Sequence, residues 1–289
     1  MEYLGNIIRP PSEAFSIILQ VTIGCSHNRC TFCGAYRDRT FQIKSWERID
    51  KDLDFAAAWC HRQSTLFLAD GDALALPDDI LTALLYRILE KLPWVRRVSC
   101  YATCQNIAGK TDAQLRGYRS LGLSRLYMGL ESGHDPTLKA IAKGVDSEAM
   151  IRAGQQARNA GIFVSVTCLL GIAGVRQSLE HAAATASVLN RMQPHQVAVL
   201  TLMVLDNTPL FRQMCAGLFI LPDQLQLFAE LRCLVAGLHS FRTQFHANHA
   251  SNYFSVNGRL PKDKERILAT VDCAMTGNVS LQAEPSRRL

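Results

Sequence analysis

Short apolar runs alternate along the chain with longer segments whose apolar residues recur at helical spacing. Six of these runs are bounded by turn-forming residues, which is typical of strands in a buried parallel sheet. The clearest helix has its apolar residues on one face between positions 80 and 92, with Pro77 near its start and Pro93 just past its end. The predicted strands are Ile17–Ile23, Thr65–Ala69, Val98–Ala102, Arg125–Leu130, Phe163–Leu169 and Val197–Leu205.

The segments between and after these strands predict the remaining helices. Six βα units in series indicate either an open doubly wound sheet or an incomplete barrel. In both architectures the chemistry lies at the carboxyl ends of the strands. The additional predicted helices are Ser45–Arg62, Thr111–Leu121, Ser147–Asn159, Gln177–Arg191 and Asp223–His239.

Composition indicates the size of the protein's core and its expected location in the cell. The 289 residues are 48% apolar and 19% charged, enough to bury the core of a soluble enzyme. The first residues lack a cationic stretch followed by an apolar run, and no later segment has about 18 uninterrupted apolar residues. We therefore expect a cytoplasmic protein without membrane contacts. The formal charge of +6 gives only a slight bias toward anionic partners.

Three of the ten cysteines fall within nine residues, directly after the first predicted strand. Cys25, Cys30 and Cys33 would therefore lie on a loop at the carboxyl edge of the sheet. Three thiolates can hold three irons of a cubane cluster and leave the fourth iron open. The same triplet also suits a zinc knuckle completed by His27 or His61, an electron-carrying cluster with a remote fourth cysteine, or three structural thiols.

The triplet resembles the cluster motif of the radical S-adenosylmethionine (SAM) superfamily. The most frequent spacing in that family has three residues in the first gap, where this chain has four, a departure that occurs in some branches. Phe32 matches the aromatic residue that the family places before the third cysteine, beside the cluster and the adenine. The resemblance implies a [4Fe–4S] cluster on Cys25, Cys30 and Cys33, with S-adenosyl-L-methionine as the second cofactor.

The resemblance also implies a fold and a division of the chain. We expect a partial (β/α)6 TIM-like barrel with a C-terminal extension that caps the barrel mouth. The expected parts are an N-terminal extension over residues 1–14, the barrel over 15–212, a C-terminal helix and capping segment over 213–276, and a flexible tail over 277–289.

Further motifs resemble the family's SAM contacts. The turn Asp70-Gly71-Asp72 follows the second strand, where relatives receive the methionine ammonium of SAM; Gly71 would allow close approach and either carboxylate would reinforce the cation. Glu131, at the end of the fourth strand, matches the ribose-binding position, and Lys143 lies where relatives carry a cation for the methionine carboxylate. An ordinary strand-to-helix turn with capping Asp residues is the alternative for the first motif, and a solvated lysine is the alternative for Lys143.

The fifth strand resembles the family segment that holds adenine through backbone and apolar side chains. This segment continues past the predicted strand through Leu170 and Gly171. The sixth strand would close the same pocket. Both segments also suit plain core strands.

Two other groups of residues are candidates for substrate chemistry. His249 and Tyr253 lie in a stretch with a second histidine and an amide, which could bind a polar substrate or move protons. A satisfied surface turn is the alternative. Cys100 and Cys104 are four residues apart, so a strand would point both to one face, and Cys104 could then donate a hydrogen atom or contact substrate. The alternative is a packing thiol.

The resemblance implies an oxidoreductase that reductively cleaves SAM to a 5′-deoxyadenosyl radical. That radical would abstract hydrogen from a small polar substrate, and flavodoxin or ferredoxin would donate the electron. Two alternatives remain open. One is a radical SAM enzyme that modifies tRNA, which the mild basicity favours and the lack of a recognisable RNA-binding domain disfavours. The other is a non-catalytic iron–sulfur or zinc protein.

Overall fold

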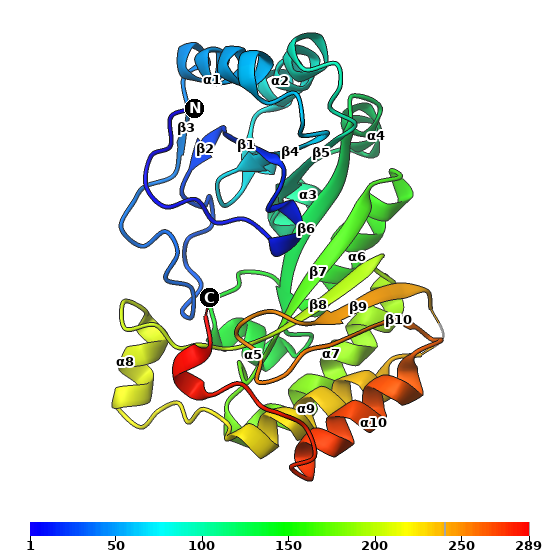
Figure 1. The fold of residues 1–289 in the computed structure, drawn as a ribbon. Coiled ribbons are helices and arrows are strands. Elements are labelled where there is room, and N and C mark those ends of the chain that lie inside the picture. The colour runs from blue at the N-terminus through cyan, green and yellow to red at the C-terminus, as the bar shows by residue number, and fades with distance from the viewer. Residues whose placement is uncertain (240, 289) are drawn as a thin grey trace. The chain divides into compact units, whose positions relative to one another are not determined.

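Mostly parallel strands form the chain's main sheet, with strand order β1-β4-β5-β6-β7-β8-β9-β10 (Figure 1). The computed structural model describes residues 1–239 and 241–288. Two compact units divide the chain: unit 1 comprises residues 1–28, 35–128 and 156–164, and unit 2 comprises residues 29–34, 129–155 and 165–289, of which Ser240 and Leu289 lie outside the described residues. Each unit is described by itself below.

In unit 1, β1, β4, β5 and the first part of β6 pair in parallel. Helix α2 buries Leu81, Leu84, Leu85 and Ile88, the apolar face that the sequence predicts. The elements that begin in this unit are β1 (Ile17–Gln20), β2 (Thr22–Ile23), β3 (Gln42–Ile43), α1 (Trp46–Trp59), β4 (Thr65–Ala69), α2 (Asp78–Lys91), β5 (Arg97–Tyr101), α3 (Cys104–Ala108), α4 (Asp112–Ser120) and β6 (Leu123–Glu131), with short 3-10 turns at Pro11–Glu13 and Ala73–Ala75.

In unit 2, β7, β8 and β9 run parallel and β10 pairs antiparallel to β9. Helix α9 packs between α7 and α10. The elements are α5 (Asp135–Ala140), α6 (Ser147–Asn159), β7 (Phe163–Leu170), α7 (Ser178–Met192), β8 (Gln196–Thr201), α8 (Pro209–Cys215), α9 (Gln224–Gly237), β9 (Thr243–Ala247), β10 (Val256–Leu260) and α10 (Lys264–Met275), with 3-10 turns at Val175–Gln177 and Glu284–Ser286. The last residues of α6 and the first two of β7 belong to unit 1.

All six predicted strand segments contain a strand, and the α/β class with a mostly parallel sheet agrees with the predicted partial barrel. The first segment, Ile17–Ile23, is divided into β1 and β2, and β2 pairs with β3 in a separate two-stranded sheet. The C-terminal region differs from the expectation in detail. It adds a strand pair, β9 and β10, and a further helix, α10, which the sequence pattern did not predict. The predicted sixth strand was too long, because β8 ends at Thr201 rather than at Leu205.

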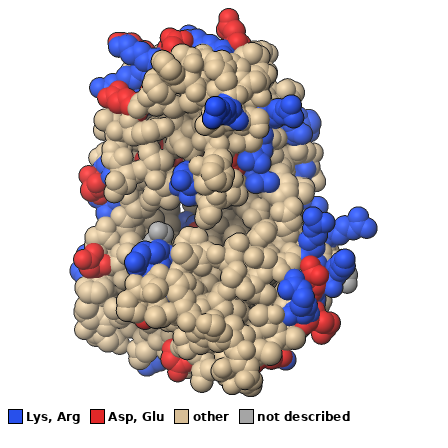
Figure 2. All heavy atoms as spheres, in the orientation of Figure 1, with Lys and Arg blue, Asp and Glu red and all other residues tan. Residues whose placement is uncertain are grey.

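The surface carries a mixture of charges. On the visible face, both basic and acidic side chains occur, most of them toward the edges of the view (Figure 2). This distribution is in keeping with the modest net charge of +6. Among the described residues, no helix has the length and apolar character needed to cross a bilayer.

Candidate functional site

The turn after β4 in unit 1 is joined by hydrogen bonds to the loop that carries Cys25. The amide of Gly71 donates to the carbonyl of Gly24 (3.2 Å), and the amide of Gly24 donates to Asp70 Oδ2 (3.4 Å). Asp72 Oδ2 accepts hydrogen bonds from the Ser26 hydroxyl (2.5 Å) and the Asn106 amide. The two loops therefore form one hydrogen-bonded structure.

Gly71 occupies a place where a side chain would not fit. A Cβ on this residue would lie 2.6 Å from Tyr36 Cε2 and 3.1 Å from Cys25 Cβ. Such distances are shorter than van der Waals contact, so this backbone lies directly against the first predicted cluster cysteine. The sequence predicts that Gly71 lets the backbone approach SAM; the structure gives a different reason for glycine here, because Tyr36 and Cys25 leave no room for a side chain.

Both carboxylates of the turn are buried. The hydroxyl of Tyr36 donates to Asp70 Oδ1 (2.6 Å), and the amide of Thr103 donates to Asp72 Oδ1 (3.4 Å). Desolvation raises the pKa of Asp70 and of Asp72, while the hydrogen bonds that they accept act in the opposite direction. Burial, and then the charge of Asp70, raises the pKa of Tyr36 well above its usual value.

Cys30, Phe32 and Cys33 belong to a short segment of unit 2. The amide of Thr31 donates to the carbonyl of Ile141 after α5, and the amide of Leu210 in α8 donates to the carbonyl of Thr31, each at 2.9 Å. Phe32 packs against an apolar cluster formed by Leu138, Ile141, Leu169, Ile172, Leu202 and Leu210. Phe32 thus anchors the backbone between the two cysteines.

The three thiols suit an iron–sulfur cluster in their chemistry. All three are partly exposed, and no disulfide occurs among the described cysteines. Cys25 belongs to unit 1, and Cys30 and Cys33 belong to unit 2. In the described part of the chain, no three His, Cys, Asp or Glu side chains are already arranged to hold a metal ion. The assignment of the ligands therefore rests on their nine-residue spacing and on their accessible thiols.

Glu131 and Lys143 meet at the end of β6. Lys143 Nζ lies 3.1 Å from Glu131 Oε1, and the two side chains are only 15% and 11% exposed. Glu131 has a positive φ of 61°, uncommon for a residue other than glycine, and this conformation ends the strand. A Cβ on Gly129 would lie 2.0 Å from Glu131 Oε1, so glycine there makes room for the pair.

At the end of β7, Leu170 is buried and Gly171 turns the chain with a φ of 83°. The amide of Gly171 donates to Oε1 of Glu230, a fully buried residue of α9, at 2.8 Å. The sequence predicts a backbone contact surface at this strand end. The sequence gives no sign that the carboxylate of Glu230 holds this strand end.

Cys104 is not on a strand. Strand β5 ends at Tyr101, and Cys104 is the first residue of α3, whose N-cap is Thr103. The argument that a strand points Cys100 and Cys104 to one face is therefore wrong. Both side chains are buried.

The His249–Tyr253 loop is anchored at the carboxyl end of β8. The side-chain Nδ2 of Asn252 donates to the carbonyl of Val199, and the Thr201 hydroxyl donates to Asn252 Oδ1, each at 2.8 Å. Ser251 Oγ accepts from the amide of Thr201 (3.2 Å). The loop thus lies at the strand end where the chemistry is expected, although His246 of the same predicted stretch lies within β9.

The segment predicted to be a flexible tail contacts this loop through its described residues. Arg287 is buried and donates to the carbonyl of Ser251 (2.7 Å) and to the Tyr253 hydroxyl (2.8 Å). The Tyr253 hydroxyl in turn donates to Glu284 (2.6 Å). Burial, followed by the hydrogen bond to Glu284, raises the pKa of Tyr253 to about 12.

Several partners of these residues escaped the sequence analysis. Tyr36, Ser26 and Asn106 hold the Asp70–Asp72 turn, and Arg287 holds the C-terminal loop. Ser26 lies within the cysteine motif itself, so the sequence could have identified it as a candidate. The other three lie outside any motif, so only the folded chain identifies them.

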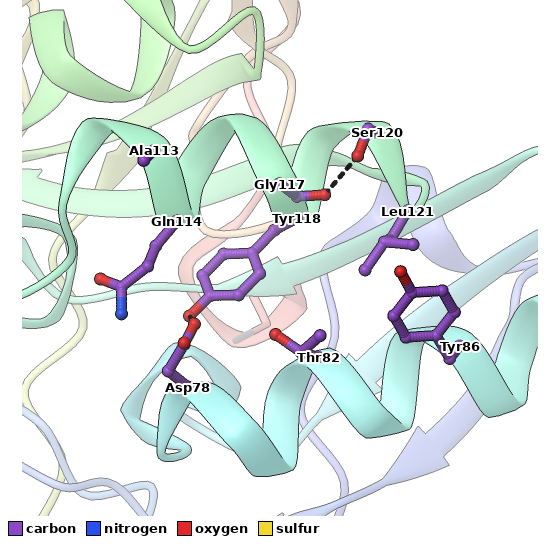
Figure 3. A pocket seen from close by; sticks show the side chains of 9 residues that line it. All are labelled: Asp78, Thr82, Tyr86, Ala113, Gln114, Gly117, Tyr118, Ser120 and Leu121. Carbon is purple, nitrogen blue, oxygen red and sulfur yellow. Dashed lines mark hydrogen bonds between the residues drawn. The ribbon is translucent and has the colours of Figure 1, made fainter.

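A shallow pocket of about 300 Å³ lies elsewhere in unit 1, between α2 and α4. Figure 3 shows the Tyr118 hydroxyl directed at Asp78, with Gln114 and Tyr86 at the rim. None of the predicted cluster or cofactor residues lines it.

Comparison with known proteins relates this chain to one family. The model of the radical SAM superfamily matches residues 19–188, more than half of the chain. A search of curated protein sequences found no match.

Three similar solved structures show the same fold. The cobalamin-dependent SAM radical enzyme OxsB aligns with a TM-score of 0.59 and 17% identity over 76% of this chain and 41% of its own. The radical SAM methyltransferase TsrM from Kitasatospora setae aligns with a TM-score of 0.57 and 16% identity, over 72% of this chain and 41% of its own. Methylornithine synthase, PylB, aligns with a TM-score of 0.55 and 16% identity, over 77% of this chain and 63% of its own. The chain spans less than two thirds of the length of each.

Proposed function

This chain belongs to the radical SAM superfamily, and we propose that it cleaves SAM reductively and uses the product to abstract hydrogen from a small polar substrate. The superfamily works with a [4Fe–4S] cluster and SAM, so the chain is an enzyme with these two cofactors. When bound, they supply a 5′-deoxyadenosyl radical after one electron enters the sulfonium, and a flavodoxin or ferredoxin is the proposed electron donor.

One structural observation carries the proposal. The turn proposed to receive the SAM ammonium lies against Cys25, since Gly71 leaves no space for a Cβ and its amide bonds to Gly24. An ordinary strand-to-helix turn has no need of this close fit. We propose Cys25, Cys30 and Cys33 as cluster ligands, with Phe32 packed beside them.

The remaining SAM contacts follow from the chemistry of the strand ends. Glu131 would accept hydrogen bonds from ribose hydroxyls, and Lys143 would pair with the methionine carboxylate. Their ion pair of 3.1 Å holds both groups ready in a mostly buried position. The backbone at Leu170 and Gly171 would contact adenine.

Anaerobic reconstitution with iron and sulfide, followed by reduction in the presence of SAM, tests the proposal. The expected result is about four irons per chain and formation of 5′-deoxyadenosine and methionine. Cys215→Ala, which changes an exposed cysteine outside the motif, is the matched control and should behave as wild type. Iron-loaded protein that leaves SAM intact would make the chain a non-catalytic cluster protein.

We propose that the loop containing His249 and Tyr253 contacts substrate rather than SAM. The loop lies at the end of β8, anchored by Ser251 and Asn252. His249→Ala should therefore spare SAM cleavage without substrate and reduce substrate turnover. Mass spectrometry of cell extracts incubated with the enzyme can identify the substrate, and unchanged turnover in the variant would assign the loop a structural role.

A further inference from the structure

A network of buried polar side chains in unit 2 is not used by the proposed chemistry. It centres on His181 of α7 and Glu230 of α9, whose side chains are 3% and 0% exposed. Glu230 lies beyond residue 188, where the match to the family model ends. Buried ionisable groups are costly unless they are well paired, so their partners indicate their role.

Glu230 holds the end of β7. Its Oε1 accepts the amide of Gly171 at 2.8 Å, and its Oε2 accepts the hydroxyl of Ser178. The amide of Gly171 would otherwise be a buried donor at the point where β7 turns. The carboxylate therefore fixes the backbone that is proposed to contact adenine.

His181 joins this strand end to the end of β6. Its Nε2 faces two oxygen atoms, Glu230 Oε1 at 3.3 Å and the carbonyl of Leu169 at 3.2 Å, so this nitrogen carries a proton. Its Nδ1 lies 2.7 Å from Ser132 Oγ. Ser132 Oγ itself accepts the amide of His134, so its hydroxyl proton is available to Nδ1.

The turn after Glu131 also rests directly on α7. The amide of Gly133 donates to Thr185 Oγ1 at 2.8 Å. A Cβ on Gly133 would lie 2.5 Å from the carbonyl oxygen of Ala184, so only glycine allows this contact. Ser132 and Gly133, the two residues that follow Glu131, are thus both held by side chains of α7.

The order serine, histidine, carboxylate is also that of a hydrolytic triad. Ser132 is fully buried, however, and its oxygen already accepts a backbone amide. A nucleophile needs access to its substrate, so this group is a positioning network.

We propose that His181 and Glu230 are positioning residues that couple the ends of β6 and β7 and thereby set the binding surface for the adenosine half of SAM. This inference rests on the proposed function. Because Glu230 belongs to α9, the C-terminal region contributes to cofactor binding as well as to the proposed substrate contacts.

The test separates the two halves of SAM. In iron-reconstituted protein, 5′-deoxyadenosine and methionine are titrated separately under anaerobic conditions. Glu230→Gln places an amide NH₂ among donors, so 5′-deoxyadenosine should bind about tenfold more weakly. The affinity for methionine and the iron content should stay as in wild type.

Ser178→Ala is the control for a general loss of stability. It removes a buried hydrogen bond from Glu230 Oε2 and leaves the bond to Gly171 in place. It should lower the melting temperature yet leave 5′-deoxyadenosine affinity within about twofold of wild type, since the strand end keeps its partner. An equal affinity loss in Ser178→Ala and Glu230→Gln would overturn the inference, as would unchanged affinity in Glu230→Gln.

His181→Gln provides a second variant in case Glu230→Gln fails to fold. Its amide can reach the Nε2 position while the Ser132 contact is lost. It should also weaken 5′-deoxyadenosine binding about tenfold, and wild-type affinity in this variant would overturn the inference. If the wild-type protein loads no iron or binds neither probe, the proposed function itself fails. If the wild-type protein binds both probes and the variants bind 5′-deoxyadenosine equally well, only the inference about His181 and Glu230 fails.

Discussion

The strand ends of the two units are held in opposite ways. In unit 1 the turn after β4 supplies its own charged groups, and Asp70 and Asp72 reach out to Tyr36, Ser26 and Asn106. In unit 2 the turns after β6 and β7 supply backbone amides and one hydroxyl, while the ionisable groups, His181 and Glu230, come from α7 and α9. The first arrangement leaves a mark in the local sequence, whereas the second does not.

This difference also separates two kinds of sensitivity to mutation. A change in the Asp70–Asp72 turn alters the loop that carries Cys25 directly. A change at His181 or Glu230 acts through backbone positions that carry no side-chain chemistry of their own. The following predictions test this contrast, from the largest expected effect to the smallest.

Replacement of Cys25 in unit 1, or of Cys30 or Cys33 in unit 2, by alanine should abolish cluster binding. Two thiolates hold a cubane poorly. Iron analysis and the absorption of the reconstituted protein measure the effect. Full iron content together with 5′-deoxyadenosine formation in any one variant would exclude that cysteine as a ligand.

Glu131→Ala should weaken SAM binding while the cluster stays intact. Loss of a hydrogen bond to a charged group costs about 1.5–3 kcal/mol, which lowers affinity roughly tenfold to a hundredfold. Anaerobic calorimetric titration measures it, with Glu180→Gln, an exposed change on α7, as the control. Unchanged affinity would show that Glu131 serves only its ion pair with Lys143.

Asp72→Asn should destabilise unit 1. Its carboxylate accepts from Ser26, Thr103 and Asn106, and an amide would place a donor against one of these donors at a cost of about 2 kcal/mol. Urea unfolding of the iron-free protein measures the change. Asp79→Asn, in the exposed first turn of α2, should leave the free energy of unfolding near that of wild type.

His249 should give the smallest effect, a change in how stability depends on pH. Burial lowers its pKa in the folded chain below the usual 6.5, so the unfolded chain takes up the proton first. Protonation therefore favours unfolding, and stability falls as the pH drops below about 6.5. His249→Asn should flatten this part of the urea-unfolding profile, and identical profiles would refute the assignment.

The sequence by itself determined the strand series, most of the helices and the residues with recognisable chemistry. Apolar runs mark buried parallel strands because both faces of such a sheet are covered, and β4 matches its predicted bounds. The sequence pattern failed at β9 and β10, which are short strands in a polar stretch. Their stability comes from pairing, of β9 with β8 and of β10 with β9, rather than from a local pattern. It also failed at Cys104, where the Thr103 cap starts a helix that the spacing argument ignored.

Only the tertiary structure decided which distant side chains hold those chemical groups in place. Gly71 was evident as a flexible turn residue, but its need for space comes from Tyr36 and Cys25. Glu230 lies 59 positions from the amide that it accepts, and Arg287 lies 36 positions from the carbonyl that it donates to. Hydrogen bonding in a buried interior depends on distances in space, and these are set when helices pack on strands, so no local pattern along the chain encodes such pairs.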